Sequence, residues 1–248
     1  MSAKRVLVTG SSRGIGRAIA RRLVLNGWTV ALQYVRDRQD ADKLHEELGA
    51  SCIGVFQADL AHPDGAKKLF ADVAAAGPLD AIVNNAGVYM PMNFAKAGDA
   101  EFEATLRKTF LVNFESPLRL ARYATQHFQS AGKPGKILNV CSRVGFKGES
   151  GAAIYAASKS ALINVTRSLA GELAPLNIQT FGIAPGWVDT AMAREGMQER
   201  LPAILKDIPL GRMAQPEDCA AVAAFLLSDQ AAYLSGVVID INGASYFH

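Results

Sequence analysis

The alternation of short apolar runs with longer segments of helical periodicity is the feature that most restricts the fold of this chain. The runs are apolar at successive positions, so both faces of each predicted strand must be covered. Helices between the strands provide that cover in an α/β fold, a doubly wound parallel sheet of about seven strands flanked by helices. The predicted strands span residues 5–9, 29–33, 52–57, 81–84, 136–141, 178–184 and 237–241, and the predicted helices span 15–26, 40–48, 63–76, 99–130, 155–173 and 217–227.

The length and composition of the chain predict one domain that spans residues 1–248. Half of the 248 residues are hydrophobic and a fifth are charged, which suits a single large core. The segment at about 187–213 is too long for a plain connection between a strand and a helix. We expect this segment to form a lid over a substrate.

Charge and cysteine usage narrow the range of partners. The net charge is +3 at pH 7, but lysines and arginines are interspersed with acidic residues, which argues against nucleic acid as a partner. No apolar stretch is long enough to cross a bilayer, and the first residues run directly into a strand without room for a signal peptide. Three separated cysteines and four scattered histidines predict neither a disulfide framework nor a metal site. We therefore expect a cytoplasmic protein without membrane or metal partners.

A glycine-rich turn follows the first predicted strand and leads into the first predicted helix. Such a turn allows close backbone approach, and the helix N-terminus attracts phosphate, so it predicts a dinucleotide site, with a purely structural turn as the alternative. No carboxylate ends the second strand, where a partner for the NAD ribose is expected, whereas Arg13 and Arg36 suit a 2′-phosphate. Unless both arginines are ordinary surface charges, this favours NADPH/NADP as the cofactor. The predicted contacts of the turn are Gly10, Ser12, Arg13, Gly14, Ile15 and Gly16.

Tyr155 and Lys159 are four residues apart in a predicted helix. This spacing places both side chains on one helix face, so the ammonium is expected to lower the pKa of the phenol. A phenol with a lowered pKa can donate and accept a proton near neutral pH. The alternative is that Tyr155 is a packed aromatic residue with one satisfied hydroxyl.

Five motifs in order resemble the short-chain dehydrogenase/reductase family over essentially the whole chain. The resemblance implies a Rossmann-type fold of seven strands and an oxidoreductase that acts on CH–OH or C=O groups. The motifs are Thr9-Gly10-x-x-x-Gly14-x-Gly16, Asn84-Asn85-Ala86-Gly87, Ser142, Tyr155-x-x-x-Lys159 and Pro185-Gly186.

The resemblance also implies roles for individual residues. Tyr155 would protonate the carbonyl oxygen, Ser142 would hold that oxygen, and Lys159 would bind the cofactor ribose. Asn113 would anchor a water that links Lys159 to solvent, although a helix kink before Pro117 is an alternative reading of this position. Further cofactor contacts implied by the family are Asp59, Leu60, Asn85, Ala86, Gly87, Pro185, Gly186, Val188 and Thr190.

Two segments, 212–217 and 238–243, narrow the expected class of substrate. Within the family, they look most like the corresponding segments of the β-ketoacyl-acyl carrier protein reductases. The expected reaction is therefore hydride transfer from NADPH to a ketone, a β-ketoacyl thioester in the first place, either free or bound to a carrier protein. Lys133 matches one basic position of the carrier-dependent enzymes, but Leu176 replaces a second one, and Arg143 could bind an anionic group or reach solvent. The expected substrate residues are Arg143, Phe146, Trp187 and Met192, with Tyr89, Met90, Phe94 and Met197 as further apolar groups.

Two alternatives remain open from the sequence. The chain could be a dehydrogenase or reductase for another alcohol or ketone, such as a sugar, a steroid or an aromatic compound. It could also be a non-catalytic dinucleotide-binding regulator, although Ser142, Tyr155 and Lys159 are all present. By resemblance, we expect a homotetramer whose contacts use the long helices.

Overall fold

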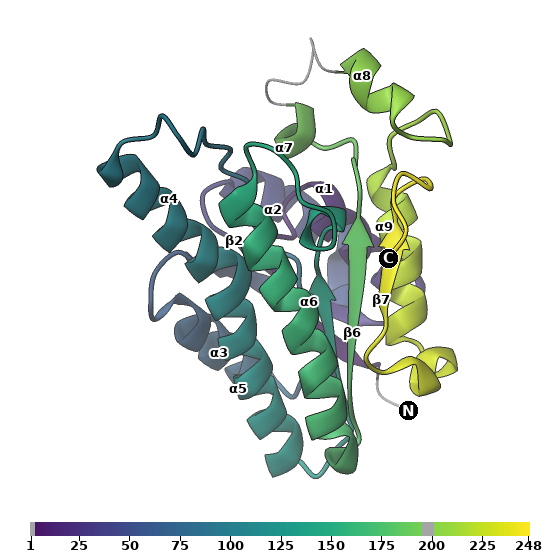
Figure 1. Cartoon of the computed structure of the whole chain (residues 1–248). Coiled ribbons are helices and arrows are strands. Elements are labelled where there is room, and N and C mark those ends of the chain that lie inside the picture. Colours follow the sequence, from purple (N-terminus) through teal and green to yellow (C-terminus); the bar gives the residue numbers. More distant parts are fainter. Residues whose placement is uncertain (1–2, 195–200) are drawn as a thin grey trace.

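Seven strands form one sheet in the computed structural model, which describes residues 3–194 and 201–248. Their order is β3-β2-β1-β4-β5-β6-β7, and every neighbouring pair is parallel (Figure 1). The predicted doubly wound sheet is therefore confirmed. The strands are β1 Arg5–Val8, β2 Thr29–Tyr34, β3 Cys52–Gln57, β4 Ala81–Asn84, β5 Gly135–Val140, β6 Ile178–Pro185 and β7 Val238–Ile241.

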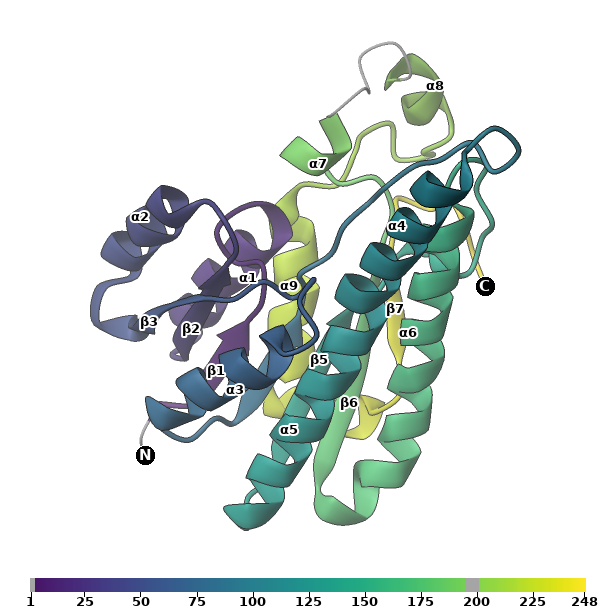
Figure 2. The ribbon, with the colours of Figure 1, turned by 90° about the vertical axis from the view of Figure 1, so that its left-hand side faces the viewer.

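Helices connect the strands and cover both faces of the sheet (Figure 2). Most of them begin and end within two residues of their predicted positions, and none of the described helices is long and apolar enough to span a membrane. The helices are α1 Gly14–Leu25, α2 Arg38–Leu48, α3 Gly65–Ala75, α4 Asp99–Phe110, α5 Ser116–Ser130, α6 Ala153–Leu173, α7 Ala191–Arg194, α8 Leu201–Lys206 and α9 Pro216–Leu227.

The single helix predicted over 99–130 is wrong in one respect. A π-helical segment, Leu111–Glu115, separates α4 from α5. Pro117 has no N–H to donate to the carbonyl of Asn113 four residues earlier, so the regular α-helical ladder cannot continue here. The irregularity places the buried side chain of Asn113 against the loop that follows β4.

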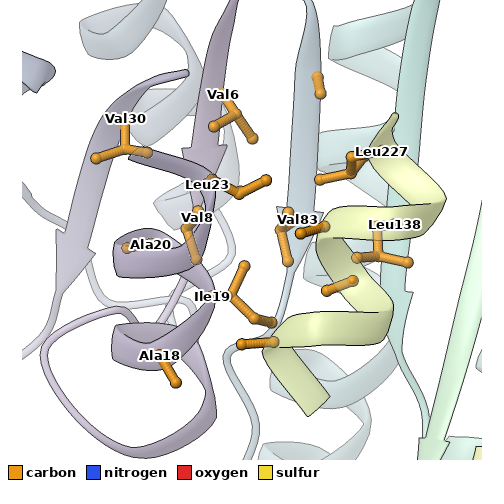
Figure 3. Close-up of a cluster of buried hydrophobic side chains, with 14 of the residues drawn as sticks. Val6, Val8, Ala18, Ile19, Ala20, Leu23, Val30, Val83, Leu138 and Leu227 are labelled. Atoms are coloured by element: carbon orange, nitrogen blue, oxygen red, sulfur yellow. The ribbon is translucent and has the colours of Figure 1, made fainter. Parts of the chain in front are cut away.

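The two faces of the sheet carry separate cores. On one face, α1 and α9 pack on the sheet, and Figure 3 shows Ile19 and Leu23 of α1 beside Val8 and Val83 of the strands. On the other face, α3 and α5 cover the side chains of the strands that point in the opposite direction. Burial on both faces explains why the strand sequences are apolar at successive positions.

The order in which the chain adds strands to the sheet reverses direction between β1 and β4. The chain first adds β2 and β3 on one side of β1, and then returns to add β4 and the later strands on the other side. The connections at the carboxyl ends of β1 and β4 therefore diverge and leave a crevice between them, which is where open α/β sheets bind ligands.

Candidate active site

A cavity of about 720 Å³ opens at the carboxyl ends of the strands. It runs from the glycine-rich turn after β1 to the N-terminal part of α6, and so joins the two ends of the predicted site. The predicted residues that line it are Gly10, Ser12, Arg13, Gly14, Ile15, Arg36, Asp59, Leu60, Asn85, Ala86, Gly87, Ser142, Arg143, Tyr155, Lys159, Pro185, Gly186, Trp187, Val188 and Thr190.

The glycine-rich turn depends on backbone conformations that only glycine adopts freely. Gly10 and Gly14 have φ values of +62° and +55°. A Cβ on Gly10 would lie 3.0 Å from Cα of Ala86, so a side chain there would push the turn away from the neighbouring loop. Gly16 does not line the cavity, but a Cβ there would collide with the Asn85 amide and the Gly10 carbonyl.

Gln33 and Thr9 hold this turn in place, although Gln33 is not among the residues that the motifs single out. The side-chain oxygen of Gln33 accepts a 2.7 Å hydrogen bond from N–H of Gly10, and its amide donates to the carbonyl of Ala58 at 2.7 Å. The hydroxyl oxygen of Thr9 accepts from the N–H groups of Asn85 and Ala86 at 2.9 and 3.0 Å. A glutamine that follows the apolar run of a predicted strand was the available sign in the sequence; the structure shows this side chain fully buried, and buried polar side chains need partners.

The N-terminus of α1 faces the cavity without a side-chain cap. Arg13 is the N-cap residue and makes no capping hydrogen bond, and the first turn of the helix holds no acidic residue. The first N–H groups of a helix lack partners within the helix, and the helix dipole favours an anion there. This arrangement fits the pyrophosphate of a dinucleotide.

Arg13 and Arg36 line the same end of the cavity. Arg13 Nη1 lies 3.6 Å from Oδ2 of Asp37, in a pair whose side chains are 64% and 52% exposed. An exposed pair of this kind contributes little to stability, so it leaves the guanidinium available to a phosphate. The two guanidinium groups fit a cofactor that carries a 2′-phosphate.

Tyr155, Lys159 and Ser142 meet at the other end of the cavity. The Lys159 ammonium donates a 2.8 Å hydrogen bond to the carbonyl of Val140 and lies 5.8 Å from the centroid of the Tyr155 ring. Ser142 follows β5, and its hydroxyl accepts a hydrogen bond from N–H of Val144 at 3.4 Å. The end of one strand and the first turns of α6 thus bring the three side chains together.

The expected lowering of the Tyr155 pKa is wrong for this arrangement. Burial raises the pKa of Tyr155 to about 12, and the hydrogen bond with Ser142 only partly opposes this rise. Burial also lowers the pKa of Lys159 to about 8. The ammonium lies over the face of the ring, and removal from water outweighs its attraction for the phenolate. Tyr155 is therefore protonated at neutral pH and can donate a proton.

Asn113 lies behind the cavity and is fully buried. Its side-chain oxygen accepts from N–H of Val88 at 2.8 Å, and its amide donates to the carbonyl of Val88 at 2.9 Å and to the Ser158 hydroxyl at 3.2 Å. Asn113 therefore joins the loop after β4 to helix α6. Its predicted role with a water stays a prediction.

Three of the four expected substrate residues need correction or lie outside the description. Arg143 is 5% exposed; it forms an ion pair with Glu149 at 3.2 Å and donates to the Ser245 hydroxyl at 3.0 Å. It is therefore neither a free anion-binding group nor a solvent-exposed one. Phe146 stacks on His248, with ring centroids 3.6 Å apart, and does not line the cavity. The side chain of Met192, like the whole of Met197, lies outside the described residues.

Trp187 lines the cavity as expected, and Tyr89 lies closer to the reactive end than the sequence indicates. The Tyr89 ring meets that of Tyr155 edge to face, with centroids 5.1 Å apart. Glu149 also lines the cavity, although no motif singles it out. Within 3–194 and 201–248, no group of three His, Cys, Asp or Glu side chains could hold a metal ion.

The described parts of the expected lid lie beside the cavity. Val188 pairs with Ala214, so the segment leaves and returns at one place, and Ile204 of α8 lines the cavity. By contrast, Lys133 and Leu176 precede β5 and β6, at the amino ends of the strands. Within one chain, the two positions that bear on carrier recognition therefore lie at the end of the sheet opposite the cavity.

Comparisons with known proteins agree with this geometry. A family model described as Enoyl-(Acyl carrier protein) reductase matches residues 10–244. The 3-oxoacyl-acyl-carrier-protein reductase FabG of Staphylococcus aureus is 35% identical over 246 residues, which cover 98% of each chain. Two solved structures are similar, with TM-scores of 0.89 and 0.90. The first is a blue fluorescent protein from a metagenomic library in complex with NADPH, 31% identical over 98% of each chain. The second is a putative NAD(P) dependent gluconate 5-dehydrogenase from Beutenbergia cavernae with bound NADP at low occupancy, 33% identical over 99% of this chain and 97% of the other.

Proposed function

This chain belongs to the short-chain dehydrogenase/reductase family of oxidoreductases, and we propose that it is an NADPH-dependent reductase that transfers a hydride to a ketone. The observation that carries the proposal is the single cavity that joins Arg13 and the open N-terminus of α1 to Ser142, Tyr155 and Lys159. A dinucleotide bound at the first end can place its nicotinamide near the phenol at the second.

The choice of NADPH rests on the charges at the end of β2. Arg13 and Arg36 line the cavity there, and the end of β2 is occupied by the buried side chains of Gln33 and Tyr34 rather than by a carboxylate. The two similar solved structures contain NADPH or NADP. When bound, this cofactor supplies the hydride.

The residues of the chain supply the proton and the orientation. As the hydride reaches the carbonyl carbon, negative charge develops on the carbonyl oxygen, and the protonated phenol of Tyr155 donates its proton to that oxygen. The Ser142 hydroxyl donates a hydrogen bond to the same oxygen and holds it in place. The Lys159 ammonium would hold the ribose hydroxyls of the bound cofactor and would favour the phenolate that remains on Tyr155.

A β-ketoacyl thioester is the proposed substrate. The proposal is supported by the 35% identity to a 3-oxoacyl-acyl-carrier-protein reductase and by the apolar and aromatic side chains of Tyr89, Trp187 and Ile204 along the cavity. A dehydrogenase of another small alcohol is the second candidate, because the similar solved structures include a putative gluconate 5-dehydrogenase. Lys133 lies before β5, away from the cavity within one chain, so it does not contact a carrier at the mouth of its own site.

Oxidation of NADPH, followed at 340 nm with a panel of ketones, tests the proposal. The panel contains β-ketoacyl thioesters, free and carrier-linked, together with sugar and aromatic ketones, and NADH serves as the control. We expect turnover of the thioesters with NADPH. Turnover of other ketones alone would overturn the substrate, and faster turnover with NADH would overturn the choice of cofactor. Oxidation of alcohols with NADP that exceeds ketone reduction would favour the second candidate.

We also propose that the protein is cytoplasmic and forms a homotetramer. Cys52, Cys141 and Cys219 are all buried free thiols, which suits a reducing compartment. The resemblance to the family supports the proposed tetramer. Light scattering checks it, and a monomeric mass would contradict it.

A further inference from the structure

The C-terminal segment 244–248 packs against the loop that carries Ser142. The guanidinium of Arg143 donates a 3.0 Å hydrogen bond from Nη1 to the hydroxyl of Ser245. Three residues further along the loop, the Phe146 ring stacks on His248 at 3.6 Å with an interplanar angle of 11°. Two separate contacts therefore join the last residues of the chain to the edge of the candidate active site.

The segment is itself fixed to the end of β7. The Ser245 hydroxyl donates to the carbonyl of Asn242 at 2.8 Å, and the Asn242 amide donates to the carbonyl of Tyr246 at 2.9 Å. The His248 ring lies 3.0 Å from a carboxylate oxygen of Asp240. Ala244 has a φ of +65°, a left-handed conformation that alanine adopts only where the surrounding structure imposes it. The last five residues thus form a defined turn.

Arg143 is the centre of this contact. Its side chain is 7% exposed and bridges two partners, since Nη2 pairs with Glu149 at 3.2 Å while Nη1 binds Ser245. A guanidinium removed from water needs such partners, because a buried charge without them is strongly unfavourable. Arg143 is also the residue next to Ser142, so its partners constrain the backbone from which the Ser142 hydroxyl projects.

The ion pair between Arg143 and Glu149 also includes a residue of the cavity wall. Glu149 lines the cavity, and its negative charge is one of the groups that raise the pKa of Tyr155. Without the Arg143 guanidinium, this carboxylate would lose its partner and be free to turn. The same ion pair therefore fixes both a neighbour of Ser142 and an acidic group near Tyr155.

We propose that Arg143 is a positioning residue that couples the C-terminal segment 244–248 to the loop 142–149, so that the chain's own C-terminus fixes the placement of Ser142 and Glu149. The effect on turnover rests on the proposed ketone reduction. The coupling itself concerns only the residues of this chain, and it can be measured without a substrate.

The experiment compares four single variants, and one double variant that combines Ser245→Ala with Arg143→Met, with the unchanged chain. Ser245→Ala removes one hydrogen bond of the contact, Arg143→Met removes the guanidinium, and Arg143→Lys restores the charge. Phe247→Ala is the matched control, because Phe247 lies in the same segment but is 78% exposed. The readouts are kcat and KM for the ketone, the Kd of NADPH from its fluorescence, and amide hydrogen exchange of residues 142–149.

We expect Arg143→Met to lower kcat about tenfold, because small displacements of orienting groups reduce rates strongly, while the Kd of NADPH stays within about twofold. Ser245→Ala should lower kcat less, and Arg143→Lys should recover part of the loss. The double variant should be no slower than Arg143→Met alone, since both changes break one contact. Exchange at residues 142–149 should rise in Ser245→Ala and stay unchanged in Phe247→Ala.

Two outcomes would overturn the proposal. One is a kcat within about twofold of the unchanged chain in both Ser245→Ala and Arg143→Met. The other is unchanged exchange at residues 142–149 in Ser245→Ala. If the unchanged chain reduces no ketone, the proposed function fails. The exchange measurement then still decides the coupling, because it needs no substrate.

Discussion

The side-chain oxygen of Gln33 accepts a 2.7 Å hydrogen bond from the backbone N–H of Gly10, and thereby fixes the first glycine of the turn to the end of β2. The amide of the same side chain donates to Ala58 after β3. One buried glutamine on β2 thus connects the loops that follow the two neighbouring strands, β1 and β3, at the cofactor end of the cavity.

Gln33→Leu should lower both stability and cofactor affinity. The change leaves the N–H of Gly10 and the carbonyl of Ala58 without partners, which should lower the free energy of unfolding by about 1–3 kcal/mol. Urea unfolding and NADPH fluorescence measure the two effects. Gln57→Leu on β3 is the control, because Gln57 is exposed and should change stability by no more than about 0.5 kcal/mol. Equal losses in both variants would contradict the role of Gln33.

Arg13→Met and Arg36→Met should each weaken NADPH binding about tenfold, because each removes a charged donor to the 2′-phosphate. The KM for NADH, which lacks this phosphate, should hardly change. Arg38→Met is the matched control, since Arg38 pairs with Asp42 at 3.2 Å and does not line the cavity. Parallel losses for NADPH and NADH would show that the two arginines do not recognise the phosphate.

Tyr155→Phe should reduce kcat about a hundredfold or more, because the carbonyl oxygen then lacks its proton donor. The Kd of NADPH should stay nearly constant, since the ring remains and only the hydroxyl is lost. The comparison variant is Tyr233→Phe, which removes the same atom from a fully exposed side chain. A Tyr155→Phe enzyme that keeps its kcat would exclude Tyr155 as the donor.

The rate of ketone reduction should fall as the pH rises through about 8. Burial raises the pKa of Tyr155 to about 12, so its proton is present throughout this range, whereas burial lowers the pKa of Lys159 to about 8. Above that pH the ammonium loses its charge and no longer favours the phenolate that proton donation leaves. In Lys159→Met the residual rate should not fall near pH 8. A fall of the rate near pH 8 in that variant would mean that another group causes it.

The pKa shifts of Tyr155 and Lys159 also predict how the free energy of unfolding depends on pH. Between pH 8 and 10.5 the unfolded chain binds a proton on Lys159 that the folded chain has released, so this group makes stability rise with pH, by at most about 1.4 kcal/mol per unit. Between pH 10 and 12 the folded chain keeps the Tyr155 proton that the unfolded chain has lost, so stability falls. Denaturant unfolding of the unchanged chain and of Lys159→Met at pH 7 to 10 checks the rise. A constant difference between them would contradict it.

The sequence allowed the sheet and the meeting of the site residues to be predicted, because both depend on local pattern. Apolar runs placed each strand within one or two residues, and motifs at successive strand ends must converge in a parallel sheet. Ser142, Tyr155 and Lys159 accordingly line one cavity with the glycine-rich turn.

Other properties depend on the folded surroundings and could not be read from spacing. The partners of Arg143 include Ser245, which is 102 positions away and is brought back only by the turn after β7. The sign of the Tyr155 pKa shift depends on the balance between burial and the Lys159 charge, and spacing indicates only the second. Phe146 was expected in the substrate region for its apolar ring, but His248 covers that ring.

The π-helical segment between α4 and α5 has a consequence for how this chain can change in length. The segment, Leu111–Glu115, contains one residue more than an α-helical path needs. Deletion of a single residue there would remove this excess, so it would not rotate α5 relative to α4. Leu120 and Phe128, both fully buried, would then keep their places against the sheet. A single deletion outside this segment has no such excess to remove, and it would rotate the helix that follows by about 100°.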